Sequence, residues 1–422
     1  MRETKEHLSI NSHLHRRDFP IGTKGVPADG RLEPYGYHLL DESLLLPIAV
    51  LNERALNNNL NWMAQFATQS HVKLAPHGKT TMMPALFAQQ MAHGAWGITV
   101  ATVAQAQAAA MSGAERIMLA NQLIGKANMA VIADLYRQGT EVIVWADNEQ
   151  QLMATAAYFA EQNIVLKCLV EIGVDGGRCG CRSEEQVKRL AKLAHALPNI
   201  ALQGIAFYEG VIGGESAEHD IREFVTKNAL LLSQIADREW IDAPTPIITG
   251  AGSAWYDVVA DALHPWSEQF EVILRPGCYL IHDKGIYQDA QNAVADRATT
   301  AQRVTCSVGQ DLESALELWA YVQSCPETNM AIINVGKRDA AFDAGLPHIE
   351  RVYRDGKLVN GIVCHSEKIM DQHLMVNCDK PLQVGDIVVM STSHPCLTLD
   401  KWRYVAVCND ELLVTHWLET AF

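Results

Sequence analysis

The sequence lacks three features: an apolar run long enough to cross a bilayer, an excess of positive charge, and a dense set of cysteines. A membrane-spanning helix needs about 20 predominantly apolar residues, so a helical membrane protein is not expected. The net charge of −15 argues against nucleic acid or an anionic membrane surface as partner, although a local basic patch is compatible with it. The first residues contain no apolar signal core, so we expect a cytoplasmic protein.

The ten cysteines are scattered along 422 residues. Disulfide frameworks are typical of short secreted chains, so we expect these thiols to be reduced, with a few available for metal. Hydrophobic residues make up 48% and charged residues 20%, an ordinary globular balance with enough length for two or three domains.

The pattern of apolar, polar and turn residues changes twice along the chain. Residues 1–45 are polar and interrupted by glycine and proline, which indicates an N-terminal arm that packs on the β domain described next. After residue 295, short apolar runs are separated by turn residues, which predicts a C-terminal antiparallel β domain over 296–422. The α/β pattern between them predicts a domain over 46–295.

That middle region alternates strand-like and helix-like runs. Strands that alternate with helices imply parallel crossovers, and eight such units favour an N-terminal (β/α)8 TIM-like barrel. An open, doubly wound sheet is the alternative, because periodicity does not show closure. The eight strand-like runs are 72–75, 97–100, 116–120, 141–146, 164–172, 200–208, 246–249 and 271–274.

The first of these runs leads into Pro76-His77-Gly78-Lys79-Thr80. Pro76 ends the strand, and Gly78 is expected to adopt a backbone angle that other residues resist. Lys79 would then lie at the mouth of the barrel, where it could form a Schiff base. The alternative is an ordinary solvated lysine.

Two glycine-containing loops follow the last two strands. The glycine loop, residues 250–253, contains Gly250, Gly252 and Ser253, and opens a helix; Gly277 and Cys278 follow the eighth strand. Backbone N–H groups in such loops bind phosphate. An amine and a phosphate site at one barrel mouth suit pyridoxal 5′-phosphate.

The arginine loop, residues 173–181, follows the fifth strand. Arg178 could contact the phenolate oxygen of the cofactor, or it could pair with Asp175 or Glu171. Tyr208, at the end of the sixth strand, could contact the cofactor ring or belong to the core. Cys179 and Cys181 have no second pair at zinc spacing, so a structural zinc site is not expected.

His394 and Cys396 lie two residues apart in the β domain. On an extended segment their side chains would point to the same side, and imidazole with thiolate suits zinc. Chance is the competing explanation for so short a motif.

Together these motifs resemble the fold-type III pyridoxal-phosphate enzymes, in the branch of D-serine dehydratase and D-threonine aldolase. The resemblance implies an alanine-racemase-type barrel, Lys79 as the Schiff-base lysine, His394 and Cys396 as ligands of a divalent metal, zinc being expected, and a homodimer. Ala75 and Thr81 depart from the arginine and histidine that the family often has there. The motifs are Pro76-His77-Gly78-Lys79-Thr80, the arginine loop, Gly204 with Tyr208 and Gly210, the glycine loop, Arg275-Pro276-Gly277, Gly336-Lys337, Asp343-Ala344-Gly345-Leu346-Pro347, Ser393-His394-Pro395-Cys396 and Asp400-Lys401-Trp402.

The expected reaction is metal-assisted elimination of water from a D-3-hydroxy amino acid such as D-serine, giving a keto acid and ammonia. Aldol cleavage, as by a D-threonine aldolase, uses the same residues, and racemisation is a third alternative that needs a second base. A carrier that holds the cofactor without turnover would not need the metal pair. A metal-dependent barrel hydrolase would bind no pyridoxal phosphate.

Overall fold

The computed structural model describes residues 19, 20, 22–31, 36–301, 308 and 311–422. The chain divides into two compact units. The barrel unit comprises residues 57–282, 286–313 and 421–422, and the β unit comprises residues 1–56, 283–285 and 314–420. Residues 1–18 of the expected arm lie outside the described part of the chain.

Eight parallel strands form the sheet of the barrel unit within the described residues, in the order β2-β9-β8-β7-β6-β5-β4-β3. Every predicted strand-like run overlaps one of them, so this part of the prediction is confirmed. The strands are β2 (Lys73–Leu74), β3 (Ile98–Val100), β4 (Arg116–Gln122), β5 (Glu141–Ala146), β6 (Leu166–Ile172), β7 (Ile200–Phe207), β8 (Ile247–Gly250) and β9 (Glu271–Leu274).

The first and last strands of that order meet and close the sheet. Trp96 N donates to Leu74 O at 2.6 Å, Thr99 N donates to Pro76 O at 2.9 Å, and His77 pairs with Thr99 in a parallel bridge. An open doubly wound sheet would leave these edges apart, so the barrel is confirmed and the alternative is excluded.

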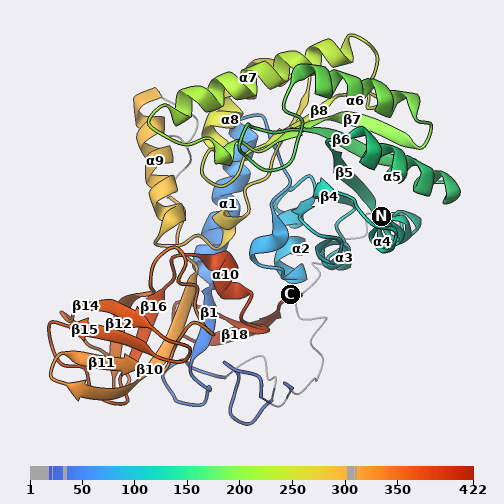
Figure 1. Ribbon diagram of the computed structural model, residues 1–422. Coiled ribbons are helices and arrows are strands. Elements are labelled where there is room, and N and C mark those ends of the chain that lie inside the picture. Colours follow the sequence, from blue (N-terminus) through green and yellow to red (C-terminus); the bar gives the residue numbers. More distant parts are fainter. Residues whose placement is uncertain (1–18, 21, 32–35, 302–307, 309–310) are drawn as a thin grey trace, which may run out of the picture. The chain divides into compact units, whose positions relative to one another are not determined.

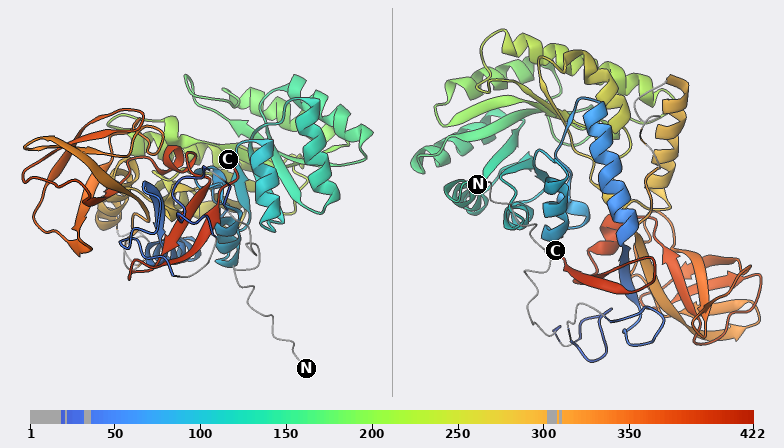
Figure 2. Two further views of the ribbon diagram at one scale, coloured as in Figure 1. Left: turned by 90° about the horizontal axis from the view of Figure 1, so that it is seen from below. Right: turned by 180° about the vertical axis from the view of Figure 1, so that it is seen from behind.

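Helices connect the strands and cover their outer face (Figures 1 and 2). Several begin at a residue whose side chain accepts a hydrogen bond from the first turn: Thr102 before α3, Asn148 before α5, and Ser183, with a full capping box, before α6. The helices are α1 (Glu53–Gln69), α2 (Pro84–Ala92), α3 (Val103–Met111), α4 (Lys126–Arg137), α5 (Glu149–Glu161), α6 (Glu184–Ala196), α7 (Ala217–Ala236), α8 (Tyr256–Leu263) and α9 (Ile286–Ala301).

The β unit is mostly antiparallel, as predicted, and contains one parallel pair, β1 with β17. Strand β1 (Ile48–Asn52) also pairs with β10, so residues placed with the barrel by the sequence pattern lie in this sheet. The other elements are β10 (Leu316–Glu327), β11 (Met330–Ile333), β12 (His348–Arg354), β13 (Lys357–Leu358), β14 (Cys364–Ile369), β15 (Leu374–Cys378), β16 (Ile387–Ser391), α10 (Pro395–Leu399), β17 (Tyr404–Cys408) and β18 (Val414–Glu419).

The described part of the arm packs into the core of the β unit. Phe19 and Val26 are buried in one cluster with β-strand residues. The Phe19 ring meets Tyr404 and Trp417 edge-on, with centroids 4.9 and 5.3 Å away. Aromatic contacts of this geometry stabilise the docked arm.

One cysteine pair departs from the expectation of reduced thiols. Cys364 on β14 faces Cys378 on β15 and forms a disulfide. Cross-strand register places them together, which their spacing in the sequence does not show. The seven other cysteines of the described residues take no part in this disulfide.

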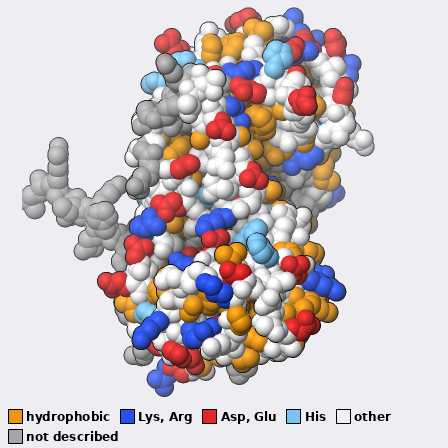
Figure 3. All heavy atoms as spheres, turned by 90° about the vertical axis from the view of Figure 1, so that its left-hand side faces the viewer, with side chains coloured by type: hydrophobic (Ala, Val, Ile, Leu, Met, Phe, Trp, Pro, Cys, Tyr) orange, Lys and Arg blue, Asp and Glu red, His pale blue; other side chains and the backbone are white. Residues whose placement is uncertain are grey.

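The helices and the surface bear on two expectations from composition, the absence of a membrane-spanning helix and the distribution of charge. No helix in the described residues is both long and apolar enough to cross a bilayer. Acidic and basic side chains are interspersed on the face drawn in Figure 3. The net charge of −15 is therefore not gathered into one patch on that face.

Candidate active site

The turn that carries Lys79 opens onto a cavity of about 250 Å³ in the barrel unit. Lys79 lies in the short helix η2 (Gly78–Thr80), and its backbone N–H donates to His77 Nδ1 at 3.4 Å. A Cβ on Gly78 would come within 2.6 Å of the Phe87 ring. Packing therefore requires glycine here. The expectation of a special backbone angle is wrong, because the φ of Gly78 is not positive.

The same cavity is lined by all of the expected cofactor-binding residues except Gly250. Gly250 lies next to the lining residue Ala251. Its carbonyl accepts a hydrogen bond from Arg275 N at 3.2 Å, and a Cβ on Gly250 would lie 2.2 Å from the Phe207 ring. The expected residues that line the cavity are Lys79, Arg178, Tyr208, Gly252, Ser253, Gly277 and Cys278.

Hydrogen-bond donors converge where the strands β8 and β9 end. Gly277 N and Cys278 N donate to Ser253 Oγ at 3.2 and 3.1 Å. A Cβ on Gly277 would come within 2.3 Å of His77 O, so only glycine lets this loop approach the Lys79 turn. The two N–H groups thus hold the Ser253 oxygen in the cavity wall beside the lysine, where the hydroxyl hydrogen can donate to an anion such as a phosphate.

Arg178 lies over the Tyr208 ring, with its guanidinium carbon 4.3 Å from the ring centroid. Among the described residues it forms no ion pair, so the alternative pairing with Asp175 or Glu171 is not found. Burial raises the pKa of Tyr208, and Glu209 adds to the effect. The cavity therefore contains a guanidinium available to an anionic ligand.

The sequence reading missed the role of the Arg275 side chain. Arg275 is buried, its Nη2 donates to Phe207 O at 2.6 Å, and its Nη1 has no partner among the described residues. Burial lowers the pKa of Arg275 to about 10, against the opposing effect of Glu209 and Glu171. An orphaned donor in a cavity wall indicates a missing acceptor, and a bound cofactor or substrate could supply one.

The sequence motif gives His77 no role of its own, whereas the structure places it in the wall of the cavity. Burial lowers the pKa of His77 well below its ordinary value, and the nearby charges of Lys79, Arg275 and Arg178 lower it further. The imidazole is therefore neutral at neutral pH.

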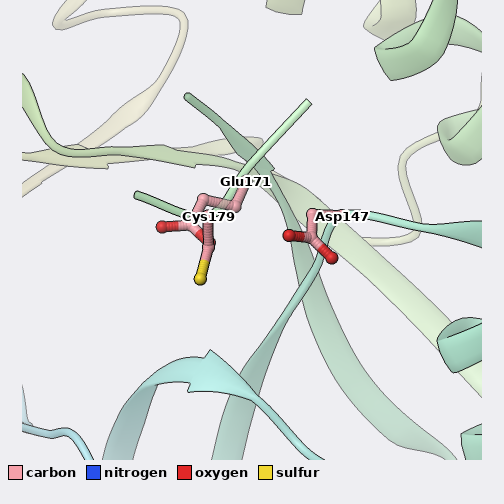
Figure 4. Close-up of side chains that lie close together, drawn as sticks. All are labelled: Asp147, Glu171 and Cys179. Carbon is pink, nitrogen blue, oxygen red and sulfur yellow. The ribbon is translucent and has the colours of Figure 1, made fainter. Parts of the chain in front are cut away.

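Three side chains at the rim, shown in Figure 4, have donor atoms within 4.8 Å of one another: Asp147, Glu171 and Cys179. Asp147 Oδ2 accepts from Gly180 N at 3.0 Å, and Glu171 Oε2 accepts from Gln122 Nε2 at 2.5 Å. These bonds hold the arginine loop and the end of β4.

Burial raises the pKa of Glu171, while Gln122, Arg275 and Arg178 lower it. Two nearby guanidinium groups oppose a cation at this cluster. We therefore assign the carboxylates of Asp147 and Glu171 to support of the surrounding loop and strands.

His394 and Cys396 lie in the β unit, but not on a strand. His394 is the N-cap of α10 and Cys396 lies in its first turn, so the same-side argument from strand alternation is wrong. His394 Nδ1 pairs with Asp343 Oδ2 at 2.7 Å, which leaves Nε2 as the second ring nitrogen for a metal. Imidazole and thiol are a donor set that fits zinc, and Asp343 was not singled out from the sequence.

This fold and cavity define an alanine-racemase-type barrel enzyme. The family model "Alanine racemase, N-terminal domain" matches residues 51–281, more than half of the chain. The chain belongs to this family of fold-type III pyridoxal-phosphate enzymes. A second model, "Putative serine dehydratase domain", matches residues 315–408, which include His394 and Cys396.

Curated and solved proteins resemble the chain over most of its length. The 3-hydroxy-D-aspartate aldolase of Paracoccus denitrificans (strain Pd 1222) is 26% identical over 391 residues, covering 88% of this chain and 91% of the relative. D-threonine aldolase from Filomicrobium marinum superposes with a TM-score of 0.76 at 20% identity, covering 92% of this chain and 98% of that chain.

A third similar protein is D-threo-3-hydroxyaspartate dehydratase from Delftia sp. HT23. One structure of a dehydratase of that name is a cysteine-to-alanine mutant in the metal-free form. It superposes with a TM-score of 0.69 at 19% identity, covering 91% of this chain and 99% of that chain. At these identities the two solved structures show the fold.

Proposed function

We propose that this protein is a pyridoxal-phosphate-dependent lyase that eliminates water from a D-3-hydroxy amino acid and gives a keto acid and ammonia. The observation that carries the proposal is the convergence on one cavity of Lys79, the Ser253 hydroxyl and Arg178, which forms no ion pair among the described residues. The aldolases and the dehydratase among its relatives support the substrate class.

The residues present fit the cofactor. Lys79 Nζ would hold its aldehyde carbon, while the Ser253 hydroxyl, held by Gly277 N and Cys278 N, would contact its phosphate. Arg178 would meet its phenolate oxygen and Tyr208 its ring. The bound cofactor supplies an electron sink for charge that develops at the α-carbon of the substrate.

The side chains of the cavity then have distinct tasks. With the cofactor and substrate bound, the Lys79 amine would be the base that takes the α-proton of the substrate. The guanidinium groups of Arg178 and Arg275 attract the substrate carboxylate. The neutral imidazole of His77 does not compete with the two guanidinium groups for the substrate carboxylate.

A divalent metal, zinc being expected, would be held by His394 Nε2 and Cys396 Sγ. Asp343 orients the imidazole through Nδ1 and fixes which nitrogen faces the metal. Such an ion supplies Lewis acidity for a hydroxyl group that leaves or loses a proton. The serine dehydratase model covers these residues, which supports their assignment to this role.

Aldol cleavage to glycine and an aldehyde is the second candidate. It is favoured by the similarity to 3-hydroxy-D-aspartate aldolase, which covers 88% of this chain. The two reactions share the cofactor and Lys79, and differ in the bond that breaks after the substrate binds. The homodimer implied by the resemblance stays a prediction, which light scattering on the purified chain tests.

The deciding experiment incubates the protein, with cofactor and zinc, with D-serine, D-threonine and D-3-hydroxyaspartate. Keto acid plus ammonia indicates elimination, and glycine plus aldehyde indicates aldol cleavage. The L-enantiomers are the matched controls and should not react. Racemisation of these amino acids without either set of products would contradict the lyase proposal.

A further inference from the structure

One buried carboxylate in the barrel has no part in the reaction described above. Glu209 follows β7 and begins the short helix η3 (Glu209–Val211), and its side chain is fully buried. Glu209 Oε2 accepts a hydrogen bond from Ala251 N at 2.9 Å, and Oε1 accepts one from Gly252 N at 2.8 Å. Each oxygen thus binds one of two consecutive amides of the glycine loop.

These amides are the donors that a phosphate would be expected to use. Successive N–H groups that point to one side form an anion site, and here an internal carboxylate occupies it. Ala251 has a φ of +68°, a left-handed conformation that is unfavourable for a residue other than glycine. The Glu209 hydrogen bonds compensate for that conformation and hold it in place.

Burial of a carboxylate is unfavourable unless hydrogen bonds and a nearby cation compensate. Burial raises the pKa of Glu209, while the two loop amides and the nearby Arg275 oppose the shift. A neutral apolar residue would avoid this cost but would leave two buried amides without an acceptor. The carboxylate therefore serves the geometry of the loop.

That geometry decides where Ser253 lies. Ser253 is two residues beyond Ala251, and its Oγ sits between Gly277 N and Cys278 N in the wall of the cavity. Glu209 thus bears on the phosphate end of the cavity.

We propose that Glu209 is a positioning residue that fixes the glycine loop so that the Ser253 hydroxyl, held by its two amide neighbours, binds the phosphate group of the cofactor. The inference rests on the proposed cofactor site. Glu209 acts through the loop and does not touch the phosphate. The phosphate contact is thereby assigned to the Ser253 hydroxyl, because the amides of Ala251 and Gly252 donate to Glu209 and those of Gly277 and Cys278 donate to Ser253 Oγ.

The test is Glu209→Gln, which keeps the size but leaves one acceptor oxygen and directs an NH₂ group at the second amide. Apo-protein is titrated with pyridoxal 5′-phosphate and with pyridoxal, which has the aldehyde but no phosphate. We expect the affinity for the phosphorylated cofactor to fall roughly 30- to 100-fold. The affinity for pyridoxal should stay within about twofold, so the ratio of the two affinities reports the phosphate contacts alone.

Exposed Glu215→Gln, in the loop that follows η3, is the matched control and should change neither affinity. Thermal unfolding of the apo-proteins checks that the variants fold. If Glu209→Gln does not fold, Glu209→Asp carries the same comparison with a smaller expected loss, about tenfold, because the shorter carboxylate reaches the two amides less well.

An equal loss of affinity for both compounds, or no loss for either, would overturn the role of Glu209. Failure of the parent protein to bind either compound would instead count against the proposed cofactor site.

Discussion

The barrel cavity and the His394–Cys396 pair are built by different means. In the cavity, the placement of polar side chains depends on backbone at strand ends: Gly277 N and Cys278 N hold Ser253 Oγ, and glycine allows the close approach of Gly277 to His77 O. At the pair, two side chains on one helical turn supply the donors, and Asp343 orients His394. The cavity therefore depends on loop packing, whereas the pair depends on two donor atoms.

This difference predicts distinct outcomes of mutation. Changes in the cavity should alter how tightly the cofactor binds, with effects graded by the fit of the loops. Changes at the His394–Cys396 pair should leave cofactor binding unchanged and lower the rate of the reaction.

The largest expected effect is that of Cys396→Ala. If the metal assists the hydroxyl group, elimination should fall on the order of a thousandfold, while cofactor binding and circular dichroism match the parent. Metal analysis should show loss of the ion. Cys325→Ala, which changes another half-buried thiol of the β unit, is the control. Full activity in metal-free protein would contradict this mechanism and favour racemisation.

Gly252→Val probes the packing of the loop. A Cβ at this position would lie 3.0 Å from the Tyr208 ring, so the larger side chain must displace the loop or the ring. We expect cofactor affinity to fall about 10- to 100-fold, with the fold retained. At Gly213, a Cβ would meet nothing within 4 Å, so Gly213→Val is the control. An unchanged affinity of the Gly252 variant would place the cofactor elsewhere.

Asp343→Asn tests whether one contact orients the metal ligand. Replacement of the charged acceptor for the Nδ1–H of His394 by a neutral amide should weaken zinc affinity about 10- to 100-fold, measured by competition with a chelator. Asp355→Asn, at an exposed turn, should leave zinc affinity unchanged. Equal zinc affinities for the two variants would show that Asp343 does not orient the ligand.

The smallest expected effect concerns stability of the barrel unit. Burial lowers the pKa of His282 from 6.5 to about 4. The folded state therefore keeps His282 neutral while the unfolded state binds a proton below about pH 6.5, so stability is lost as pH falls from 6.5 to 4. The loss is at most about 3 kcal/mol.

His282→Asn should flatten this dependence in urea unfolding measured at both pH values. Asparagine tolerates the left-handed conformation at this position, where φ is +50°. The same slope in the variant and the parent would assign the pH dependence to other groups.

The parts of the fold that were predictable are those with a local signal. Buried parallel strands and their crossover helices repeat along the chain, and residues such as Lys79, Ser253 and Gly277 follow strand ends, which meet at one rim of a barrel. The closure of the sheet and the position of β1 between β10 and β17 depend on pairing between distant segments.

The missed site residues have the same explanation. Glu209 has no part in the motifs of the sequence analysis, and its partners lie 42 and 43 residues further along the chain. Asp343 meets His394 across 51 residues. Neither pair has a spacing that marks it in the sequence, so tertiary contacts alone reveal them.

The central claim is that Lys79 carries the cofactor, and one measurement tests it most directly. The protein is loaded with pyridoxal 5′-phosphate, reduced with borohydride, digested and mapped by mass spectrometry, with Lys79→Ala as control. The account predicts a yellow protein and a stable cofactor adduct on the peptide that contains Lys79, absent from the variant. A specific adduct on another lysine, or none in the parent protein, would contradict it.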